Sequence, residues 1–207
     1  MVEWLQATKE YMSKNTWLTT DLHFSHKGMI ELCGRPQDFE KRIVRHWDRL
    51  VKPSDTVICL GDICIGDDKA VHEKYIQQLP GFKILVKGNH DKKSDTWYES
   101  NGWQICCESM VINRYGHKVL LSHRPPSTKV LAAYDEDWRL KQSDLYDLSI
   151  HGHQHTLMPK NYTPDKVRFL LSLEYENYEP VLFQSFIQRC EKIRNEVTTS
   201  PLGPNLN

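Results

Sequence analysis

The chain has 207 residues, and its 27 Lys and Arg balance 27 Asp and Glu, so the formal net charge is zero. A hydrophobic content of 39% with 26% charged residues is typical of one ordinary globular domain with a real core. With this balance the chain has no overall excess of basic residues, which nucleic-acid-binding proteins often have. It also has no acidic excess, which is typical of disordered chains.

Strands and helices alternate along the chain, which predicts an α/β fold. Short β-branched or continuous apolar runs predict strands at 16–20, 55–60, 83–86, 104–112, 118–122, 148–150 and 168–174. Apolar residues recur at helical spacing in three segments, 39–51, 69–79 and 181–193. We expect residues 1–14 to be an N-terminal extension, 15–195 to form a single domain, and 196–207 to be a disordered tail.

The N-terminal segment and the cysteines bear on the compartment. Charged residues between Glu3 and Lys14 interrupt any apolar run, and no stretch of the chain is apolar enough to span a bilayer. The six cysteines include no C-x2-C pair, and Cys59, Cys106 and Cys107 lie in strand-like runs. We therefore expect reduced, structural thiols in a cytoplasmic protein without a membrane partner.

Side chains that can bind metal follow five of the predicted strands, directly where each strand ends. The five groups are Asp21-Leu22-His23, Gly61-Asp62, Gly88-Asn89-His90-Asp91, Ser122-His123 and His151-Gly152-His153-Gln154-His155. Ligands of α/β proteins bind beyond the carboxyl ends of strands, where distant loops converge. Any one of these residues alone is more simply explained by a cap or a turn. Together they form an oxygen and nitrogen set without thiolate, which suits two ions that share a carboxylate.

The motifs DLH (21–23), GD (61–62), GNHD (88–91), SH (122–123) and GHQH (152–155) occur in this order. As a complete set they resemble the signature of the calcineurin-like metallophosphoesterases, in particular their compact bacterial and phage members. The resemblance runs from about Trp17 to Val181 and includes LSLEYENYEPV at 171–181, which looks like a closing strand. It implies two packed mixed β-sheets flanked by helices, a four-layer α/β/β/α sandwich.

The resemblance also implies a role for each motif residue. The implied metal ligands are Asp21, His23 and His155 for the first ion, Asn89, His123 and His153 for the second, and Asp62 as the bridge. His90 would face the scissile phosphate and stabilise charge or protonate the leaving oxygen, with Asp91 orienting it by a hydrogen bond. The implied reaction is in-line hydrolysis of a phosphodiester or phosphomonoester by a hydroxide that bridges two divalent ions. Mn is the expected metal, and Fe, Zn or Ni suit the same ligands.

The roles of four further polar residues are less determined. His26 either approaches a phosphate or caps the helix that follows it, and Arg124 is expected to bind a substrate phosphate, with a weaker case for Arg35. His151 is expected to be structural or to support a ligand. We expect solvated positions for His46, His72, His117, Asp67 and Asp68, and core positions for Trp47, Tyr75 and Phe186.

Three functions are compatible with these motifs. The leading hypothesis is hydrolysis of a small phosphorylated substrate such as a nucleotide or cyclic nucleotide, because the chain is compact. A metal-dependent nuclease is the alternative, disfavoured by the neutral charge balance and the lack of a long basic stripe. A non-catalytic scaffold is less favoured, because no motif residue is missing. The segment 125–144 is the candidate substrate-gating loop, and the oligomeric state is open.

Overall fold

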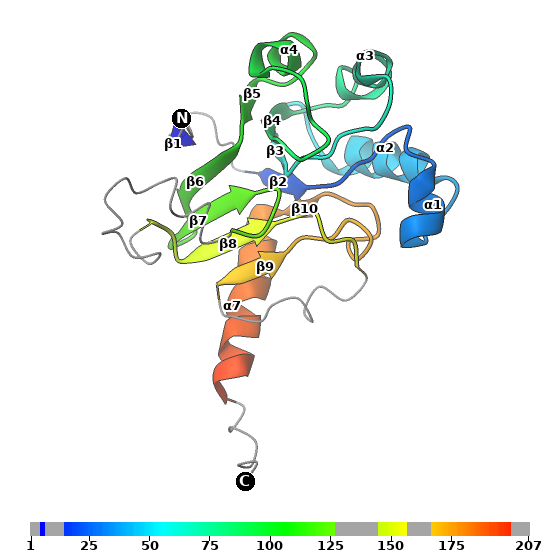
Figure 1. Cartoon of the computed structure of the whole chain (residues 1–207). Helices are drawn as coiled ribbons and strands as arrows, with labels where there is room; N and C mark the ends of the chain where they lie inside the picture. Colours follow the sequence, from blue (N-terminus) through cyan, green and yellow to red (C-terminus); the bar gives the residue numbers. More distant parts are fainter. Residues whose placement is uncertain (1–4, 7–14, 127–144, 157–166, 200–207) are drawn as a thin grey trace.

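The computed structural model describes residues 5–6, 15–126, 145–156 and 167–199, and two five-stranded sheets form its centre (Figure 1). The sheet that we call the β7 sheet contains, in spatial order, β1 (Leu5–Gln6), β6 (Ser109–Arg114), β7 (His117–Ser122), β8 (Leu148–His151) and β9 (Arg168–Leu170). The other, the β3 sheet, contains β10 (Val181–Leu182), β2 (Thr16–Thr19), β3 (Thr56–Cys59), β4 (Phe82–Val86) and β5 (Ile105–Cys107). Each sheet joins one antiparallel pair to parallel strands, so both are mixed, and the expected fold class is confirmed.

Helices cover the outer face of the β3 sheet. They are α1 (Gly28–Cys33), α2 (Phe39–Leu50), α3 (Asp68–Val71), the π-helical turn η1 (His72–Ile76) and α4 (Asp95–Ser100). Ile43 and Trp47, one turn apart on α2, are buried in one cluster with Val57 and Leu85 of the sheet. A second cluster fills the space between the sheets, and α7 (Phe183–Thr199) contributes Phe183, Phe186, Ile187 and Cys190 to it.

The register of the parallel strands brings their carboxyl ends to the same edge. In the β3 sheet, Thr19 pairs with Cys59, and Cys59 pairs with Leu85. In the β7 sheet, Ser122 pairs with His151, which pairs with Leu170. The loops that follow these six strands therefore start side by side, which is the condition for a site built from distant segments.

Every strand and helix predicted from the apolar patterns has a counterpart, but several boundaries differ. The closing strand suggested at 171–181 is wrong, because 171–180 form loop and turns and only the two-residue strand β10 follows them. The predicted strand 104–112 is two strands, because the chain passes from one sheet to the other at Glu108, and the strand from 168 ends at Leu170. The predicted helix 181–193 begins with the short strand β10, and α7 continues to Thr199, past the expected start of the tail. The extension 1–14 contains β1, which pairs with β6. Residues 127–144 of the gating-loop segment and 200–207 lie outside the described residues.

Three histidines for which the sequence predicts solvated positions have structural partners instead. His46 is buried, with Nδ1 3.3 Å from the carbonyl oxygen of Tyr178. His72 is fully buried and accepts a hydrogen bond from the indole N–H of Trp103 at 3.1 Å. His117 lies 2.9 Å from a carboxylate oxygen on each side. Periodicity treats histidine as polar, but an imidazole whose nitrogens find partners can be buried at low cost. None of the described helices is long and apolar enough to cross a bilayer.

Candidate metal centre

The predicted ligands lie in loops that follow five strands. Asp21 and His23 follow β2, Asp62 follows β3, Asn89 follows β4, His123 follows β7, and His153 and His155 follow β8. Backbone hydrogen bonds join neighbouring loops, from Asp21 N–H to Gly61 C=O at 2.9 Å and from Gly152 N–H to His123 C=O at 3.0 Å. These bonds extend each sheet past its strands and hold the ligand positions in register.

Four of the seven predicted ligands adopt a left-handed backbone conformation. The φ angles are 51° at Asp21, 49° at His23, 55° at Asp62 and 71° at His153. Residues other than glycine rarely adopt this conformation, and Asp and His are among those that do so most readily. Such strained positions concentrate at functional sites, where the surrounding structure enforces them.

Two motif glycines allow the loops to approach the carboxylates. A Cβ atom on Gly152 would collide with the hydroxyl of Thr20 and with Oδ2 of Asp21, and a Cβ on Gly88 would collide with Oδ1 of Asp62. Close approach of the backbone thus explains why GHQH and GNHD both begin with glycine.

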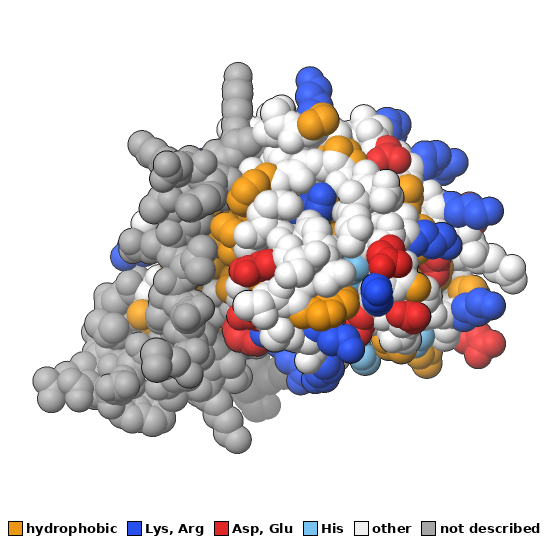
Figure 2. Space-filling view, turned by 90° about the horizontal axis from the view of Figure 1, so that it is seen from above, with side chains coloured by type: hydrophobic (Ala, Val, Ile, Leu, Met, Phe, Trp, Pro, Cys, Tyr) orange, Lys and Arg blue, Asp and Glu red, His pale blue; other side chains and the backbone are white. Residues whose placement is uncertain are grey.

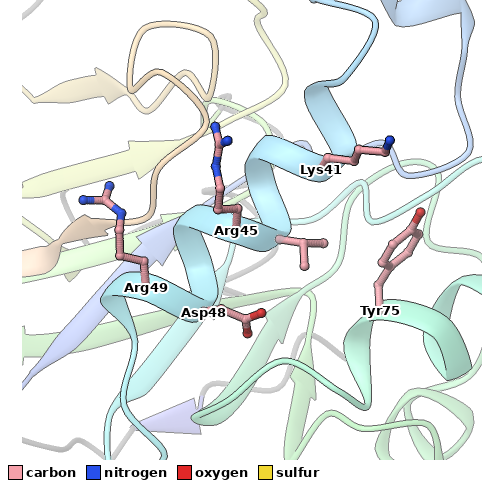
Figure 3. A pocket seen from close by; sticks show the side chains of 6 residues that line it. Lys41, Arg45, Asp48, Arg49 and Tyr75 are labelled. Atoms are coloured by element: carbon pink, nitrogen blue, oxygen red, sulfur yellow. The ribbon is translucent and has the colours of Figure 1, made fainter.

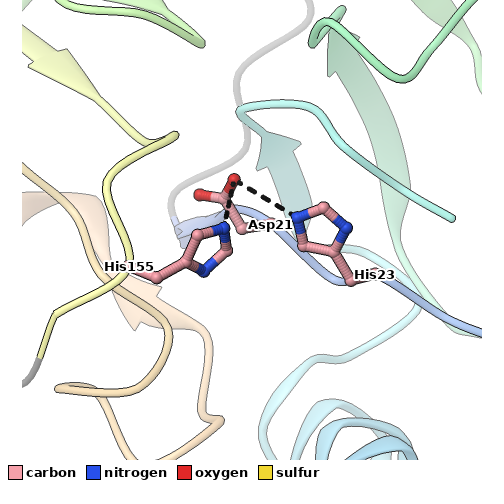
Figure 4. A group of neighbouring side chains, drawn as sticks. All are labelled: Asp21, His23 and His155. Carbon is pink, nitrogen blue, oxygen red and sulfur yellow. Dashed lines mark ion pairs between the residues drawn. The ribbon is translucent and has the colours of Figure 1, made fainter. Parts of the chain in front are cut away.

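Asp21, His23 and His155 form the first cluster (Figure 4). Oδ1 of Asp21 lies 3.9 Å from Nε2 of His23 and 3.7 Å from Nε2 of His155. Oδ2 of Asp21 accepts hydrogen bonds from the Thr20 hydroxyl at 2.6 Å and the His153 N–H at 2.9 Å, so Oδ1 is left to face the imidazoles. Oδ1 of Asp21 and Nε2 of His23 are buried and have no hydrogen-bond partner among the described residues. Unpaired buried polar atoms are costly, and a cation bound by both would satisfy them.

Asp62, His123 and His153 form the second cluster, together with the side-chain carbonyl of Asn89. Nε2 of His123 lies 3.3 Å from Oδ2 of Asp62 and 3.1 Å from both Nδ1 of His153 and Oδ1 of Asn89. Nδ1 of His123 lies 2.7 Å from the carbonyl oxygen of Leu60, which can only accept, so Nδ1 carries a proton. In the neutral ring, which is the form that binds metal, the Nε2 lone pair then faces the cluster. Oδ2 of Asp62 is also 3.7 Å from Nε2 of His23, so this carboxylate lies between the two clusters.

Burial and neighbouring charges set the protonation of these side chains. Burial raises the pKa of Asp21, and it lowers the pKa of His23 to about 3, with a further contribution from the Arg35 charge. Burial opposes ionisation of Asp62 too, but the hydrogen bond and charge of His123 outweigh it and lower the pKa of Asp62 to about 2. Metal binding requires an ionised carboxylate and a neutral imidazole, which is the state that Asp62 and His23 adopt at neutral pH.

Residues 18–171 match the family model described as the calcineurin-like phosphoesterase superfamily domain. The chain belongs to this superfamily. It is therefore a phosphoesterase, an enzyme of a family that generally depends on divalent metals, and the resemblance seen in the five motifs is confirmed.

Relatives of this phosphoesterase span most of its length. The uncharacterized protein MJ1445 of Methanocaldococcus jannaschii is 27% identical, covering 86% of this chain and 93% of its own length. The Gene 66 protein of Mycobacterium phage L5 is 32% identical, and the match covers 70% of this chain and 79% of the phage protein. Among solved structures, the protein of unknown function AQ665 from Aquifex aeolicus superposes with a TM-score of 0.66 at 27% identity, covering 84% of this chain and 98% of that one. The shared fold thus includes both sheets of the phosphoesterase.

The donor atoms of this phosphoesterase fit divalent metal ions. In each cluster the ligating atoms lie within 4.8 Å of one another, and they are carboxylate oxygens and imidazole nitrogens. Cys33, His155 and Glu174 form a third group with the same spacing. There the Arg35 guanidinium lies 2.7 Å from Glu174 and 3.4 Å from Nδ1 of His155, and it supplies the positive charge that a metal would bring.

His90 lies beside the carboxylate of Asp62, the predicted bridge between the two ions. Its backbone N–H donates to Oδ1 of Asp62 at 2.9 Å, and its half-exposed imidazole has Nε2 3.9 Å from Oδ2 of the same residue. The predicted hydrogen bond between the His90 imidazole and Asp91 is replaced by three bonds to the backbone. The buried carboxylate of Asp91 accepts from the N–H groups of Gly88 (2.7 Å), Asp62 (2.8 Å) and Ile63 (3.1 Å). Its short side chain lies inside the loop, so it fastens the β3 and β4 loops together instead of orienting His90.

Of the four less determined residues, His26 and Arg124 lie beside the predicted metal ligands, and Arg35 and His151 are buried. His26 has Nδ1 3.4 Å from Nδ1 of His23 and does not cap α1, whose N-cap is Lys27. Arg124 is exposed, with Nη2 3.1 Å from Oδ1 of Asn89. The substrate role considered for Arg35 is wrong, because its side chain is 0% exposed. His151 is buried in β8, where burial lowers its pKa to about 4, in line with a structural role.

Sequence reasoning missed Glu174. Its Oε1 lies 2.9 Å from Nδ1 of His155, and the hydrogen bond with His155 and the charge of Arg35 overcome burial and lower the pKa of Glu174 to about 2. Glu174 follows β9, so the sixth of the strands that end at this edge is also followed by a polar residue of the site. The rule that selected the predicted ligands, polar residues shortly after strand ends, points to Glu174 when it is applied to β9.

Proposed function

We propose that this phosphoesterase hydrolyses a phosphodiester or phosphomonoester of a small substrate, such as a nucleotide or cyclic nucleotide, with two divalent ions, Mn²⁺ being the best candidate. The observation that supports two ions is the position of Oδ2 of Asp62, between Nε2 of His23 at 3.7 Å and Nε2 of His123 at 3.3 Å. Asp21, His23 and His155 would hold one ion, Asn89, His123 and His153 the other, and Asp62 both. Two ions about 3.5–4 Å apart stabilise charge on the phosphate oxygens and lower the pKa of water.

The protein residues around the ligands have complementary tasks. The imidazole of His90 is half-exposed beside Asp62, where it can hydrogen-bond the phosphate and donate a proton to the leaving oxygen. The exposed guanidinium of Arg124 lies next to Asn89 and can bind two phosphate oxygens at once. His26, beside His23, is a further candidate for contact with the substrate.

The test separates metal binding from proton transfer with two variants. Wild type should contain about two Mn²⁺ per chain after reconstitution, measured by mass spectrometry, and should hydrolyse bis-p-nitrophenyl phosphate only with metal. Asp62→Asn should lose metal and activity together. His90→Ala should keep both ions and lose about 10²- to 10⁴-fold in kcat, the usual contribution of a general acid. Hydrolysis by both variants at the wild-type rate would refute the proposal.

The surface gives limited support to the nuclease alternative. A shallow hollow of about 600 Å³ on α2 is lined by Lys41, Val44, Arg45, Asp48, Arg49 and Tyr75 (Figure 3). Asp48 lies within this row of cations, and Arg49 pairs with Glu179 at 2.6 Å, so the positive charge is partly neutralised. None of the seven ligands lines the hollow. Basic and acidic side chains also lie interspersed over the described part of the face in Figure 2, where a nucleic-acid site needs a continuous basic track.

A further inference from the structure

We infer that Arg35 and Glu174 are positioning residues for the first metal cluster, an inference that rests on the proposed function. One buried guanidinium holds the loop of Asp21 and His23, and through Glu174 it holds the imidazole of His155. The pair thereby places the three ligands that belong to one ion alone, and it contacts none of the ligands proposed for the other ion alone.

Arg35 contacts the loop after β2 directly. Its Nη2 donates to the carbonyl oxygen of Asp21 at 2.8 Å, and its Nη1 donates to the carbonyl oxygen of Leu22 at 3.1 Å. The guanidinium also lies over the ring of Phe39, 5.1 Å from its centroid, so an aromatic face supports it. A fully buried arginine with this many donors in use fixes the backbone of the loop that presents Asp21 and His23.

Glu174 determines which nitrogen of His155 is free to bind metal. Oε1 of Glu174 lies 2.9 Å from Nδ1 of His155, and a carboxylate only accepts, so the imidazole donates from Nδ1. Nε2, which faces Oδ1 of Asp21 at 3.7 Å, then carries the lone pair. Oε1 also accepts from Nε of Arg35 at 2.8 Å, and Oε2 accepts from the Ser172 hydroxyl at 3.1 Å, so the carboxylate is held in one orientation. Carboxylates behind metal-binding histidines fix the tautomer and the ring in this way.

The second cluster has a different support. Nδ1 of His123 faces the backbone carbonyl of Leu60 at 2.7 Å, and Asn89 is approached by the exposed Arg124. Removal of the Arg35–Glu174 pair should therefore weaken one ion and leave the other unchanged. A salt bridge with only a structural role would lower stability without this selectivity.

The experiment compares wild type with the double variant Arg35→Met/Glu174→Met, which removes both buried charges together and so leaves no unpaired ion to unfold the protein. Glu174→Asp retains a carboxylate and tests for rescue. Glu176→Gln is the matched control, because it disrupts a 2.6 Å ion pair with Arg189 two residues along the same turn. Binding of Mn²⁺ alone is measured by isothermal titration calorimetry, and the tautomer of His155 in the metal-free protein by ¹⁵N NMR.

The double variant should bind one Mn²⁺ about 10- to 100-fold more weakly and the other as wild type does, the usual effect of losing a residue behind a ligand. Its His155 should populate both tautomers, whereas wild type, Glu174→Asp and Glu176→Gln should show the Nδ1–H form. If wild type binds two ions and the double variant binds both equally well, or keeps the Nδ1–H form alone, the positioning role is refuted and the proposed function stands. If wild type binds no Mn²⁺ and shows no hydrolysis, the proposed function is refuted, and this role with it.

Discussion

A single missing Cβ atom at residue 152 allows Asp21 to reach its position. The Gly152 backbone lies against the Thr20 hydroxyl and the Asp21 carboxylate, and φ at this glycine is not in the left-handed region. Gly152→Ala should therefore act through collision alone, displacing Asp21, costing about 1–3 kcal/mol of stability, and weakening Mn²⁺ binding at the first cluster at least tenfold. Urea unfolding and Mn²⁺ titration measure the two effects.

Gly116→Ala is the control for this prediction. Gly116, in the turn between β6 and β7, has a φ of 81°, and a Cβ atom added there would have no neighbour within 4 Å, so alanine is strained by its backbone and collides with nothing. This variant should lose stability and keep wild-type Mn²⁺ affinity. Equal Mn²⁺ affinity in Gly152→Ala and Gly116→Ala would show that the close approach at Gly152 does not place Asp21.

At the residue level the sequence predicts that polar side chains at strand ends form the site. It does not predict ion pairs between residues that are far apart in the chain. The sequence assigns His153 and His155 to different ions, and they lie in different clusters. Arg35 and Glu174 are 139 residues apart, and each on its own is an ordinary charged residue of the kind usually exposed. Their burial follows only from their pairing, which no local pattern encodes.

At the element level, length determines which helices and strands are predictable. α2 has twelve residues and shows its buried face as a clear period, whereas α1 and α4 have six each, too few for a period to emerge. The segment 104–112 has no turn residue, so the passage between sheets at Glu108 leaves only the adjacent polar residues Glu108 and Ser109 as a signal. Val181 and Leu182 extend the apolar pattern of α7, so periodicity includes them in the helix although they pair with β2.

An ion-pair cluster attaches α7 to the β7 sheet and makes this attachment sensitive to pH. His117 of β7 has Nδ1 2.9 Å from Asp147, just before β8, and Nε2 2.9 Å from Glu191 of α7. Burial lowers the pKa of His117, but hydrogen bonds to both carboxylates outweigh burial and raise it above 6.5. A histidine with a raised folded-state pKa contributes stability that is complete below its unfolded pKa of about 6.5 and is lost as pH rises through the folded-state value.

The prediction is that wild type exceeds His117→Gln in urea midpoint at pH 6 and that the difference shrinks towards pH 9. Both proteins are measured with chelator, so that metal binding does not contribute to the pH dependence. The acidic partners are 41% and 46% exposed, so solvent screening keeps the effect small. A difference that stays constant or grows with pH would mean that the charged form of His117 does not stabilise the attachment.

At the scale of the whole molecule, both clusters draw their predicted ligands from both sheets. The first combines Asp21 and His23 from the β3 sheet with His155 from the β7 sheet, and the second combines Asp62 with His123 and His153. An ion in either cluster would therefore join the carboxyl-end loops of the two sheets. The alternation of strands with helices, and the polar residues at the strand ends, predict that these loops converge. The distances between the ligand atoms depend on the register of the strands, which the sequence does not specify.

Metal should consequently stabilise the fold as a whole. An ion that binds only the folded state adds about 2.7 kcal/mol per site when free metal is a hundredfold above Kd. For a chain of this size about 2–4 °C of Tm corresponds to each kcal/mol, so each ion should raise Tm by about 5–11 °C. Calorimetry of wild type with Mn²⁺ and with EDTA measures the shift. Asp62→Asn, which loses the carboxylate between the clusters, should show a much smaller shift at the same Mn²⁺ concentration, because both sites are weakened. An equal shift in both proteins would place the stabilising ion elsewhere on the molecule.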